Sequence, residues 1–480
     1  MKKDSKEKID QIIDFKDRKR ELKIITESLK SNKFEFMLTF GRRRVGKTEL
    51  HLHATKDLKV IYYLARKGRN EEKFKEQCVK TIPEAEMIRT DYESLFKFLK
   101  DKVDVIIIDE FPEMVREEKN VLNIFQYIVD IILKNSKLKL FLLGSSISMM
   151  KSEILSAPSP LYGRKTISLH LKPFNFHTLK EFYPEATLKE IIQIYGFSGG
   201  IPYYLNQITV PFWEWLKKEL KRQTFIRDEA EFLLRYEFFN SGRYFSILEA
   251  IAFGKNQLNQ IAQYTKIPVT SLPQYLTSLE EVNFMKREVP VTEQKSTKRG
   301  SYILSDNFLR FYFRFIYPNL ESLDRMIMDV RDIRTQYPEY MGKIFEDVVS
   351  QFLIDFRKDL DFIKLNENIE LGEYFNFTKI GRWWWKEDEI DLIAFNPQTN
   401  KAILIECKWQ DDVNGIEVVT NLLNKKSKIR YRGKYKNKEH ILIIFAKSFK
   451  NKTNIKQIGE TSIIYITLED MNEILEKRYS

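Results

Sequence analysis

Residues 41 to 48, GRRRVGKT, form the first group whose types and spacing could support chemistry. They fit the pattern G-x-x-x-x-G-K-[ST] in full, and they stand between an apolar run and a stretch that can form a helix, the context that gives this pattern meaning. Its glycines let backbone N–H groups close around phosphate oxygens, Lys47 reaches the β and γ oxygens, and Thr48 binds Mg²⁺. The sequence therefore predicts an ATP site.

Two acidic residues at the end of the apolar run VDVIII extend this site. Asp109 can complete the Mg²⁺ shell, and Glu110 can polarise the attacking water as a general base. A later run, LFLLG, ends at Ser145, whose hydroxyl could sense the γ-phosphate or could belong to an ordinary turn. The first chemistry predicted is hydrolysis of ATP.

A second group of chemical residues lies in EIDLIAFNPQTNKAILIECKW, near the C-terminus. Asp391 stands on one expected strand, and Glu406 and Lys408 stand on the next. Alternation along a strand puts Glu406 and Lys408 on the same face, with Cys407 on the other. Two carboxylates can hold Mg²⁺ or Mn²⁺, and a neighbouring lysine can orient or deprotonate water against a phosphodiester.

The elements that must position these residues change in type along the chain. Four short apolar runs alternate with helical stretches at the start, which is typical of a covered parallel sheet. They are residues 34–40, 59–64, 103–108 and 138–143. Helical periodicity follows after about residue 205. Four further strands are expected around residues 389–395, 402–408, 440–446 and 462–467.

Between the two groups lies a pattern of three helices and a charged hairpin. The helices are YFSILEAIAFG, QLNQIAQYT and a third from about Val269 to Glu280, and the hairpin is FMKREVPVTEQKSTKRGSYIL. That order predicts a winged helix. Its third helix, with Thr270, Gln274 and Thr277, and its basic hairpin could contact DNA, or the module could dock a protein segment.

A chain of 480 residues accommodates about three domains at ~150 residues each, and the expected fold class is multidomain α/β. The predicted parts are a P-loop ATPase domain with a parallel sheet at 1–172, a helical lid at 173–240, a winged-helix domain at 241–318, a linker at 319–340 and, at 341–480, an α/β domain whose EIDLIA and IECKW segments resemble those of restriction-endonuclease-like domains.

The N-terminal motifs together resemble the AAA+/STAND-like archaeal ATPase family. The matching segments are FKDRKREL (15–22), GRRRVGKTEL (41–50), IIIDEFPE (106–113), LLGSSISMM (142–150), SPLYGRK (159–165) and YGFSGGIPYYL (195–205). The resemblance implies that Arg18 and Glu21 shape the adenine end and that Arg164 approaches the γ-phosphate of its own site or of a neighbour's. It also implies that Gly200 and Pro202 contact the nucleotide. Arg164 as a surface arginine and GGIP as a plain turn are the alternatives.

A set of residues is thus expected to act on the nucleotide. The expected binding residues are Gly41, Arg42, Arg43, Arg44, Val45, Gly46, Lys47, Thr48, Glu49, Ser145 and Pro202. The expected catalytic residues are Lys47, Asp109, Glu110 and Arg164, with Thr48 and Asp109 on the metal. The three arginines of the loop could instead hold partner carboxylates or serve packing and solubility.

The C-terminal group looks like the PD-(D/E)xK nuclease superfamily, and from YILSDNFLRFYFRFIYPN onward the chain resembles the DUF234-type tail of such archaeal ATPases. This implies catalysis by Asp391, Glu406 and Lys408. It also implies a metal site of Asp391 and Glu406, to which Glu346 adds a carboxylate from the preceding helix. A nuclease fold does not guarantee cutting, so an inactive domain that binds DNA or a protein partner is the alternative.

Charge points to an anionic partner. Lys and Arg number 80 against 68 Asp and Glu, a net charge of +12. Much of the excess falls in residues 424 to 460, where Tyr431 and Tyr435 alternate with cations, an arrangement that could track a phosphate backbone or form a solvated helix end. The tryptophans at 383 to 385 could brace nucleic acid, with at least one expected in the core. DNA is the expected partner.

Cys78 and Cys407 are the only cysteines, which excludes a disulfide framework and a Cys/His zinc cluster. The apolar runs are far shorter than the roughly 20 residues of a membrane span, and MKKDSKEKID lacks the apolar core of a secretory signal. A cytoplasmic location without membrane partners is expected, and nucleotide-dependent self-association is a further expectation.

The sequence thus predicts a machine in which ATP binding and hydrolysis change how DNA is held at a C-terminal nuclease site. The alternative is an ATP-dependent regulatory switch whose winged helix and C-terminal domain only bind a partner.

Overall fold

The computed structural model describes residues 15–222, 224–238, 240–358, 371–432, 435–450 and 457–479. The chain folds into two compact units. Unit 1 consists of the residues up to Phe174 together with Ile201–Tyr204 and Leu233–Ser241, and unit 2 consists of Asn175–Gly200, Leu205–Phe232 and the residues from Gly242 onward. In the described part of the chain, no helix has both the length and the apolar character needed to cross a lipid bilayer.

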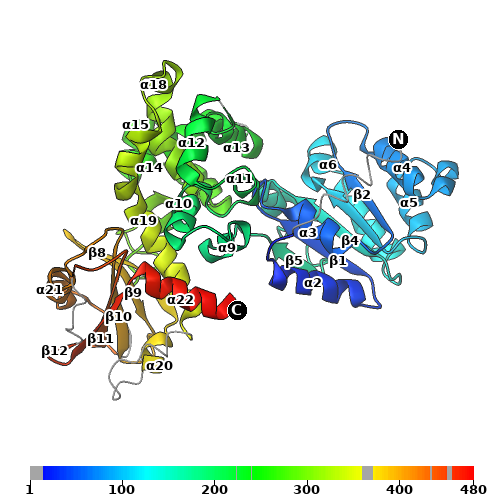
Figure 1. Ribbon diagram of the computed structural model, residues 1–480. Helices are drawn as coiled ribbons and strands as arrows, with labels where there is room; N and C mark the ends of the chain where they lie inside the picture. Colours follow the sequence, from blue (N-terminus) through cyan, green and yellow to red (C-terminus); the bar gives the residue numbers. More distant parts are fainter. Residues whose placement is uncertain are drawn as a thin grey trace. The chain divides into compact units, whose positions relative to one another are not determined.

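Unit 1 is built on a five-stranded parallel sheet (Figure 1). The strands are β1 (Glu35–Phe40), β2 (Val60–Leu64), β3 (Val105–Asp109), β4 (Lys139–Gly144) and β5 (Ile167–His170). Their order in the sheet is β2-β3-β4-β1-β5, so β4 lies between β1 and β3. Every residue of β3 and β4 is buried, as is typical of parallel strands covered on both faces. The parallel sheet expected from the apolar runs is confirmed.

Helices cover this sheet. α2 (Lys19–Lys30) and α3 (Lys47–Ala54) pack against one face through Ile25 and Leu50, which share a buried cluster with Met37 and Phe141. The remaining helices of at least seven residues that lie wholly in unit 1 are α4 (Asn70–Thr81), α5 (Tyr92–Leu99), α6 (Phe111–Glu117) and α7 (Val121–Tyr127). α3 begins where the loop after β1 ends, so the sheet and the helix together fix both ends of that loop.

Aromatic side chains hold together the helical part of unit 2. α10 (Leu188–Ser198) begins at Thr187, whose hydroxyl accepts a hydrogen bond from Glu190 N. The Phe197 ring centre lies 5.2 Å from Trp215 of α12 (Phe212–Lys221) and 4.9 Å from Phe311 of α17 (Asn307–Phe311). α19 (Val330–Phe356) continues for 27 residues, across the expected boundary at residue 340.

Three helices and a hairpin follow one another in the expected order. They are α14 (Ser241–Ala252), α15 (Leu258–Thr265), α16 (Leu272–Glu281) and the antiparallel strands β6 (Met285–Glu288) and β7 (Ser301–Leu304). The loop between β6 and β7 is attached to the C-terminal sheet, because Val291 N donates a hydrogen bond to Arg382 O at 2.9 Å. The loop of the hairpin is therefore attached to the C-terminal sheet.

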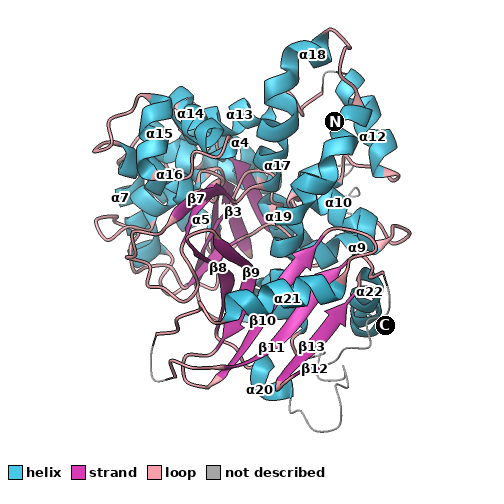
Figure 2. Cartoon of the chain, turned by 90° about the vertical axis from the view of Figure 1, so that its left-hand side faces the viewer, coloured by secondary structure: helices cyan, strands magenta, loops and turns pink. Residues whose placement is uncertain are grey.

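The C-terminal part of unit 2 is a separate mixed sheet. Its order is β12-β13-β11-β10-β9-β8, with β10, β11 and β13 parallel and β8 and β9 antiparallel (Figure 2). The strands are β8 (Lys379–Trp385), β9 (Asp388–Phe395), β10 (Lys401–Lys408), β11 (Glu439–Ala446), β12 (Gln457–Ile458) and β13 (Thr461–Ile466). α21 (Gly415–Lys426) packs on one face through Val419 and Leu422. α19 contributes Phe352, whose ring centre lies 6.2 Å from that of Phe445 in β11.

The strand β8 was not foreseen. It contains the three tryptophans, and only Trp383 among them is buried in the core, whereas Trp385 is partly exposed beneath the Arg299 guanidinium, 3.7 Å from its ring centre. The expectation that at least one of these indoles packs inside is thus met. Two further helices flank the sheet, α20 (Leu371–Phe375) and α22 (Leu468–Tyr479).

Candidate functional site

The loop after β1 is shaped by its two glycines. A Cβ atom on Gly41 would lie 2.3 Å from Leu171 O, so only glycine fits where the loop leaves the sheet. Gly46 has φ +92° at the N-cap of α3, a backbone conformation that side chains oppose. The loop therefore presents its backbone closely to whatever lies in front of α3.

Lys47 is enclosed by this loop. Its side chain is almost fully buried, and its Nζ donates hydrogen bonds to Gly41 O at 2.9 Å and Arg42 O at 3.3 Å. Burial lowers the pKa of the ammonium, while the carboxylates of Glu110 and Asp109 act in the opposite direction. Lys47 is thus held at the N-terminal end of α3 by two backbone carbonyls.

Thr48 and Asp109 are in direct contact, although they come from distant parts of the sequence. Thr48 Oγ1 donates to Asp109 Oδ2 at 2.5 Å, and the Tyr62 hydroxyl donates to the same oxygen at 3.1 Å. Burial raises the pKa of Asp109, which the hydrogen bond from Thr48 partly opposes. A hydroxyl and a carboxylate oxygen side by side are hard ligands suited to Mg²⁺.

Glu110 is turned away from the line of β3 by a left-handed backbone conformation, with φ +53°. Its carboxylate accepts hydrogen bonds from Ser145 Oγ at 2.7 Å and from the Tyr236 hydroxyl at 2.8 Å. Ser145 reaches it because β4 lies next to β3 in the sheet. The structure thus gives Ser145 a position beside the expected general base.

Glu237 is a partly buried carboxylate at this site that the sequence did not reveal. Ser146 Oγ and Ser148 Oγ lie 3.5 Å from its Oε2. Burial raises its pKa to about 7, against the attraction of the Lys47 and Arg116 cations. Neither Tyr236 nor Glu237 lies in a recognisable motif, and their distance along the chain from residue 48 left no local signal.

The three loop arginines each face a tyrosine. The guanidinium carbon of Arg44 lies 3.9 Å from the ring centre of Tyr203, and that of Arg43 lies 4.5 Å from Tyr236. Arg42 Nη2 donates to the Tyr204 hydroxyl at 3.1 Å. Cation–π contacts of this kind contribute about 0.5–2 kcal/mol each. The arginine side chains therefore tie the loop to residues 203, 204 and 236.

The other residues expected at the nucleotide occupy varied positions. Val45 is fully buried, Glu49 is exposed in the first turn of α3, and a Cβ on Gly46 would lie 3.8 Å from Pro202 Cγ. Arg18 Nη2 donates to Val45 O at 3.1 Å. Arg164 Nε pairs with Asp130 at 2.8 Å.

Asp391 and Glu406 are brought together in unit 2. The antiparallel register pairs Ile405 with Leu392, so the next pair is Glu406 and Asp391, on the face that α21 covers. Glu406 accepts hydrogen bonds from Lys408 at 2.8 Å and Lys425 at 3.0 Å. The expected placement of Glu406 and Lys408 on one face therefore agrees with the strand geometry.

The pKa values of the two carboxylates are shifted in opposite directions. Burial, together with the charge of Glu406, raises the pKa of Asp391 to about 6, even though Asp391 Oδ2 accepts a hydrogen bond from Cys407 N. Burial also raises the pKa of Glu406, but the charges and hydrogen bonds of the Lys408 and Lys425 ammonium groups outweigh this effect, so the pKa of Glu406 is lowered. Lys408 Nζ also lies 3.8 Å from Asp391 Oδ2, so one ammonium contacts both carboxylates.

Glu346 lies on α19 and is neutralised by neighbouring cations. Lys343 Nζ donates to it at 2.8 Å, and Arg382 Nε lies 3.1 Å from its Oε2. Burial and the Asp391 charge nevertheless raise the pKa of Glu346 to about 7. Arg382 also lies 3.4 Å from Glu288 in the hairpin, so it links the hairpin with the carboxylates.

These carboxylates fit a divalent cation only in part. Within the described ranges, no group of three or more His, Cys, Asp and Glu side chains is arranged to hold a metal ion. Asp391 and Glu406 alone offer oxygens on one face, which suits a site completed by water and substrate oxygens. Glu346 is separately engaged with Arg382 and Lys343.

The surfaces expected to meet DNA differ in their availability. Gln274 and Thr277 are exposed on α16, and Thr270 is exposed in the turn before the helix begins. In the hairpin, the Arg287 guanidinium is already engaged, because it donates hydrogen bonds to Lys295 O and Thr297 O. Tyr431 is buried with its hydroxyl 3.0 Å from His440 Nε2, so it is not presented to a base.

Family comparisons cover both ends of the chain. Residues 15–208 match an ATPase domain found predominantly in Archaea. Residues 312–427 match DUF234, described as "Archaea bacterial proteins of unknown function". An uncharacterised protein of Methanocaldococcus jannaschii is 46% identical over 442 residues, which are 92% of this chain and 97% of that protein. The chain belongs to this archaeal ATPase family. The recognition based on the motifs of this family is confirmed.

Two solved structures are also similar to the chain. The Walker-type ATPase of Pyrococcus abyssi is 24% identical, with a TM-score of 0.49, and the match covers 63% of this chain and 96% of that one. The ORC2 protein of Aeropyrum pernix is 13% identical, with a TM-score of 0.40, and the match covers 66% and 95%.

Proposed function

We propose that unit 1 binds ATP with Mg²⁺ and hydrolyses it. The observation that carries this proposal is the 2.5 Å contact between Thr48 Oγ1 and Asp109 Oδ2, beside the enclosed ammonium of Lys47. Thr48 and Asp109 would hold the cation, which neutralises charge on the phosphate oxygens. The N–H groups of Lys47 that now meet two carbonyls are the donors that the β and γ oxygens would accept.

Glu110 is the proposed general base. Its carboxylate would accept a proton from the attacking water, and the hydrogen bonds from Ser145 and Tyr236 fix its orientation. Ser145 thus acts through Glu110 in this mechanism, as a positioning residue. The nucleotide specificity for adenine, and the contribution of Arg164, belong to the same proposal.

Steady-state ATPase rates of variants test this assignment. We expect Lys47→Ala to lose hydrolysis and Glu110→Gln to lose it while still binding ATP in calorimetry, because the base is not needed for binding. Lys80→Ala, which removes an exposed lysine at the end of α4, is the matched control and should keep the wild-type rate. Unchanged turnover in Lys47→Ala would refute the site.

A second function is favoured by the pairing of Asp391 and Glu406 with Lys408. We propose that this constellation hydrolyses phosphodiester bonds in DNA with Mg²⁺ or Mn²⁺, as the nuclease-like resemblance implies. Asp391 and Glu406 would hold the cation, which activates water and stabilises charge on the phosphate. Lys408, released from its carboxylates, would face the scissile phosphate.

Supercoiled plasmid with each metal, with and without ATP, tests the second function. Nicking that is lost in Lys408→Ala and kept in Lys477→Ala, an exposed lysine on α22, supports the nuclease. If no metal supports cutting while DNA still stimulates the ATPase, the regulatory switch with an inactive nuclease-like domain is the better reading.

We further propose that α14 to α16 with the β6–β7 hairpin form a winged helix that meets DNA through α16. The exposed polar side chains of α16 support a contact of this kind. The hairpin is engaged with the C-terminal sheet through Val291 and Arg382, so its role in this scheme is coupling. The loss of DNA binding in a Gln274→Glu variant, with folding intact, would support the α16 contact over protein docking.

A further inference from the structure

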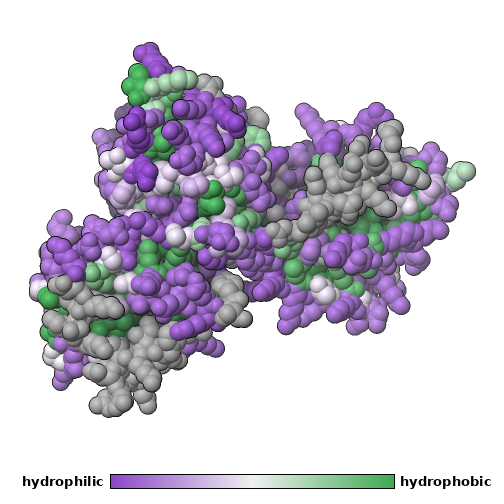
Figure 3. Space-filling view, in the orientation of Figure 1, coloured by the Kyte–Doolittle hydropathy of each residue, from purple (hydrophilic) through white to green (hydrophobic). Residues whose placement is uncertain are grey.

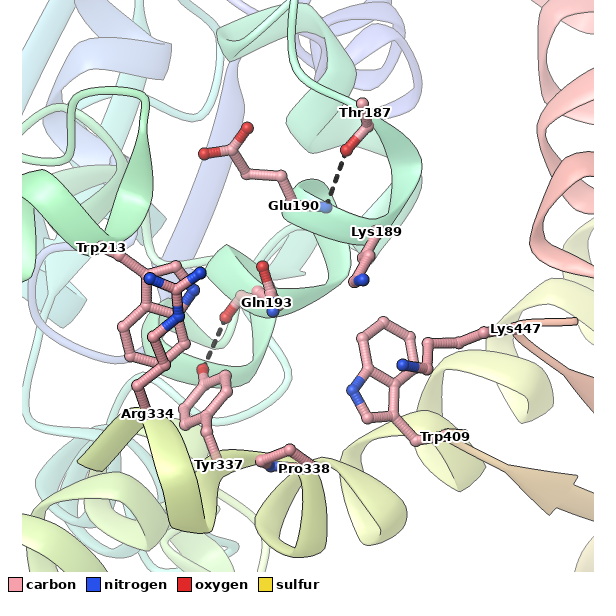
Figure 4. Close-up of a pocket in the computed structure, with 10 residues that line it drawn as sticks. All are labelled: Thr187, Lys189, Glu190, Gln193, Trp213, Arg334, Tyr337, Pro338, Trp409 and Lys447. Atoms are coloured by element: carbon pink, nitrogen blue, oxygen red, sulfur yellow. Dashed lines mark hydrogen bonds between the residues drawn. The ribbon is translucent and has the colours of Figure 1, made fainter. Parts of the chain in front are cut away.

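A pocket of about 370 Å³ lies within unit 2, between the helices α10, α12 and α19 and the ends of β10 and β11 (Figure 4). Tryptophan side chains stand on opposite sides of it. Trp213 of α12 is on one side with Arg334, and Trp409, directly after β10, is on the other with Lys447. Pockets of a few hundred Å³ lined by aromatic rings and a few polar groups are typical ligand sites.

Both indoles are held in place by their neighbours. The ring centre of Trp409, which is buried, lies 5.2 Å from that of Phe345. Trp213 is met edge-on by Tyr337, with the ring centres 4.9 Å apart, and the Tyr337 hydroxyl donates to Gln193 O at 2.8 Å. A rigid aromatic face loses little entropy when a planar ring stacks on it, so the half-buried Trp213 is suited to a flat ligand, and the buried Trp409 forms the opposite wall of the pocket.

The charge of the lining favours an anion. Lys189, Arg334 and Lys447 contribute three cations, against the carboxylate of Glu190 in the lining and that of Asp411, which pairs with Lys447. Glu190 is already engaged, because its Oε1 accepts a hydrogen bond from Phe212 N at 2.8 Å. The guanidinium of Arg334 lies 5.6 Å from the Trp213 ring centre, and the Lys447 ammonium lies 5.6 Å from that of Trp409. Each indole is therefore paired with a cation.

A base and its phosphate combine the two properties that this lining selects. An aromatic base can stack on an indole, and Arg or Lys beside the ring can meet the phosphate. Pro338 in the lining has no N–H, so the carbonyl of Arg334, four residues earlier, loses its usual helical donor. That carbonyl is an acceptor suited to an N–H group on a base.

The pocket lies beside the strand ends that carry the proposed nuclease residues. Trp409 follows Lys408 in the chain, and Lys447 follows Ala446, which is the register partner of Lys408. Lys447 N also donates to Gln410 O at 3.1 Å. The pocket and the Asp391–Glu406–Lys408 constellation therefore share one edge of the sheet, on opposite faces of β10.

We infer that this pocket binds one nucleotide of a single DNA strand whose neighbouring phosphate lies at Lys408. A paired base has both faces stacked within the duplex, so only an unpaired or extruded base can enter. This inference rests on the proposed action of unit 2 on DNA. It makes the pocket a determinant of specificity for single-stranded or locally opened substrates.

The test measures binding of a fluorescein-labelled single-stranded oligothymidylate by anisotropy, without metal, so that cutting does not intervene. Arg334→Glu in the pocket is compared with Arg331→Glu, which makes the same charge change in the first turn of the same helix. Trp213→Ala removes the half-buried indole without disturbing the buried Trp409. Stacking of one base on an aromatic ring strengthens binding by about tenfold or more. We therefore expect Arg334→Glu and Trp213→Ala each to lower the affinity for the oligonucleotide about tenfold. Arg331→Glu should stay within about twofold of the wild type.

Each of the following outcomes overturns the inference. Equal affinities in the two arginine variants would show a general charge effect, and duplex binding that responds as strongly as single-strand binding would remove the role of an unpaired base. Competition by free thymidine monophosphate as strong as by the oligonucleotide would assign the pocket to a small nucleotide. If the wild-type protein binds no DNA of any form, the proposed action of unit 2 on DNA fails as well. If the wild-type protein binds the oligonucleotide and the pocket variants bind it equally well, only the inference about the pocket is refuted.

Discussion

Arg382 Nε lies 3.1 Å from Glu346 Oε2, so a guanidinium on β8 neutralises a buried carboxylate on α19. The same guanidinium reaches Glu288 in the hairpin at 3.4 Å. The elements of unit 2 that carry the proposed nuclease residues and the proposed DNA-binding module therefore meet at one side chain.

Removing this cation should destabilise unit 2. We expect Arg382→Ala to lower the free energy of unfolding by about 3 kcal/mol, because the buried Glu346 then keeps only Lys343 as a cationic partner. Arg325→Ala removes a largely exposed ion pair with Glu321 and should cost no more than about 0.5 kcal/mol. Urea unfolding of both variants measures the difference, and equal values would show that the Arg382 pair is not structurally important.

The raised pKa of Glu346 predicts how stability depends on pH. The folded protein holds a proton on this carboxyl up to a pKa of about 7, whereas the unfolded chain releases it near the ordinary value of 4.5. The folded state thus binds more protons between these values, so stability falls as the pH rises from about 4.5 to 7. Asp391, with its pKa raised to about 6, acts in the same direction.

Glu346→Gln should remove part of this loss. We expect the variant to gain on the order of 2 kcal/mol relative to wild type between pH 5 and pH 8, because glutamine carries no charge to bury. Denaturant midpoints taken across that range provide the measurement. Parallel curves for the two proteins would mean that Glu346 titrates normally.

Glu237 should make ATP binding pH-dependent. Because its pKa is about 7, the Glu237 carboxyl becomes negatively charged between pH 6 and pH 8. This charge interacts with the Lys47 ammonium and would offset the positive charge that the triphosphate needs. We expect the KM for ATP to rise over this pH interval, and to rise more in the wild type than in Glu237→Gln. The ionisation of ATP itself affects both proteins equally, so the difference between them reports on Glu237. Superimposable KM profiles would place Glu237 outside the nucleotide site.

The two glycines at Gly41 and Gly342 give a matched pair of substitutions. Gly41→Ala would push a Cβ to 2.3 Å from Leu171 O, and we expect a loss of about 2–3 kcal/mol together with weaker ATP binding. Gly342 lies inside α19 with no atom within 4 Å of an added Cβ, so Gly342→Ala should stabilise the helix by about 0.5–1 kcal/mol. Thermal unfolding and calorimetry of the pair test both signs, and a tolerated Gly41→Ala would contradict the close approach.

The sequence predicted what local patterns encode. Lys47, Thr48 and Asp109 follow strands that are continuous apolar runs, so the parallel sheet and the contact at its edge could be anticipated. The placement of Glu406 and Lys408 on one face followed from strand alternation. β8 escaped notice because GRWWW has neither period-two alternation nor an apolar run long enough to indicate a strand.

Side chains that reach a site from far along the chain could not be predicted. Tyr236 and Glu237 lie within a helical stretch whose periodicity shows only an amphipathic helix, and their approach to Glu110 depends on tertiary packing. The pocket between Trp213 and Trp409 has the same origin, because its walls are separated by nearly two hundred residues.

The stacking of Arg42, Arg43 and Arg44 on three tyrosines has a mechanical consequence. Tyr203 and Tyr204 belong to one short excursion of the chain into unit 1, and Tyr236 belongs to another, and both excursions continue into unit 2 at either end. A triphosphate that displaced the loop would therefore also displace both excursions, and with them four covalent connections between unit 1 and unit 2.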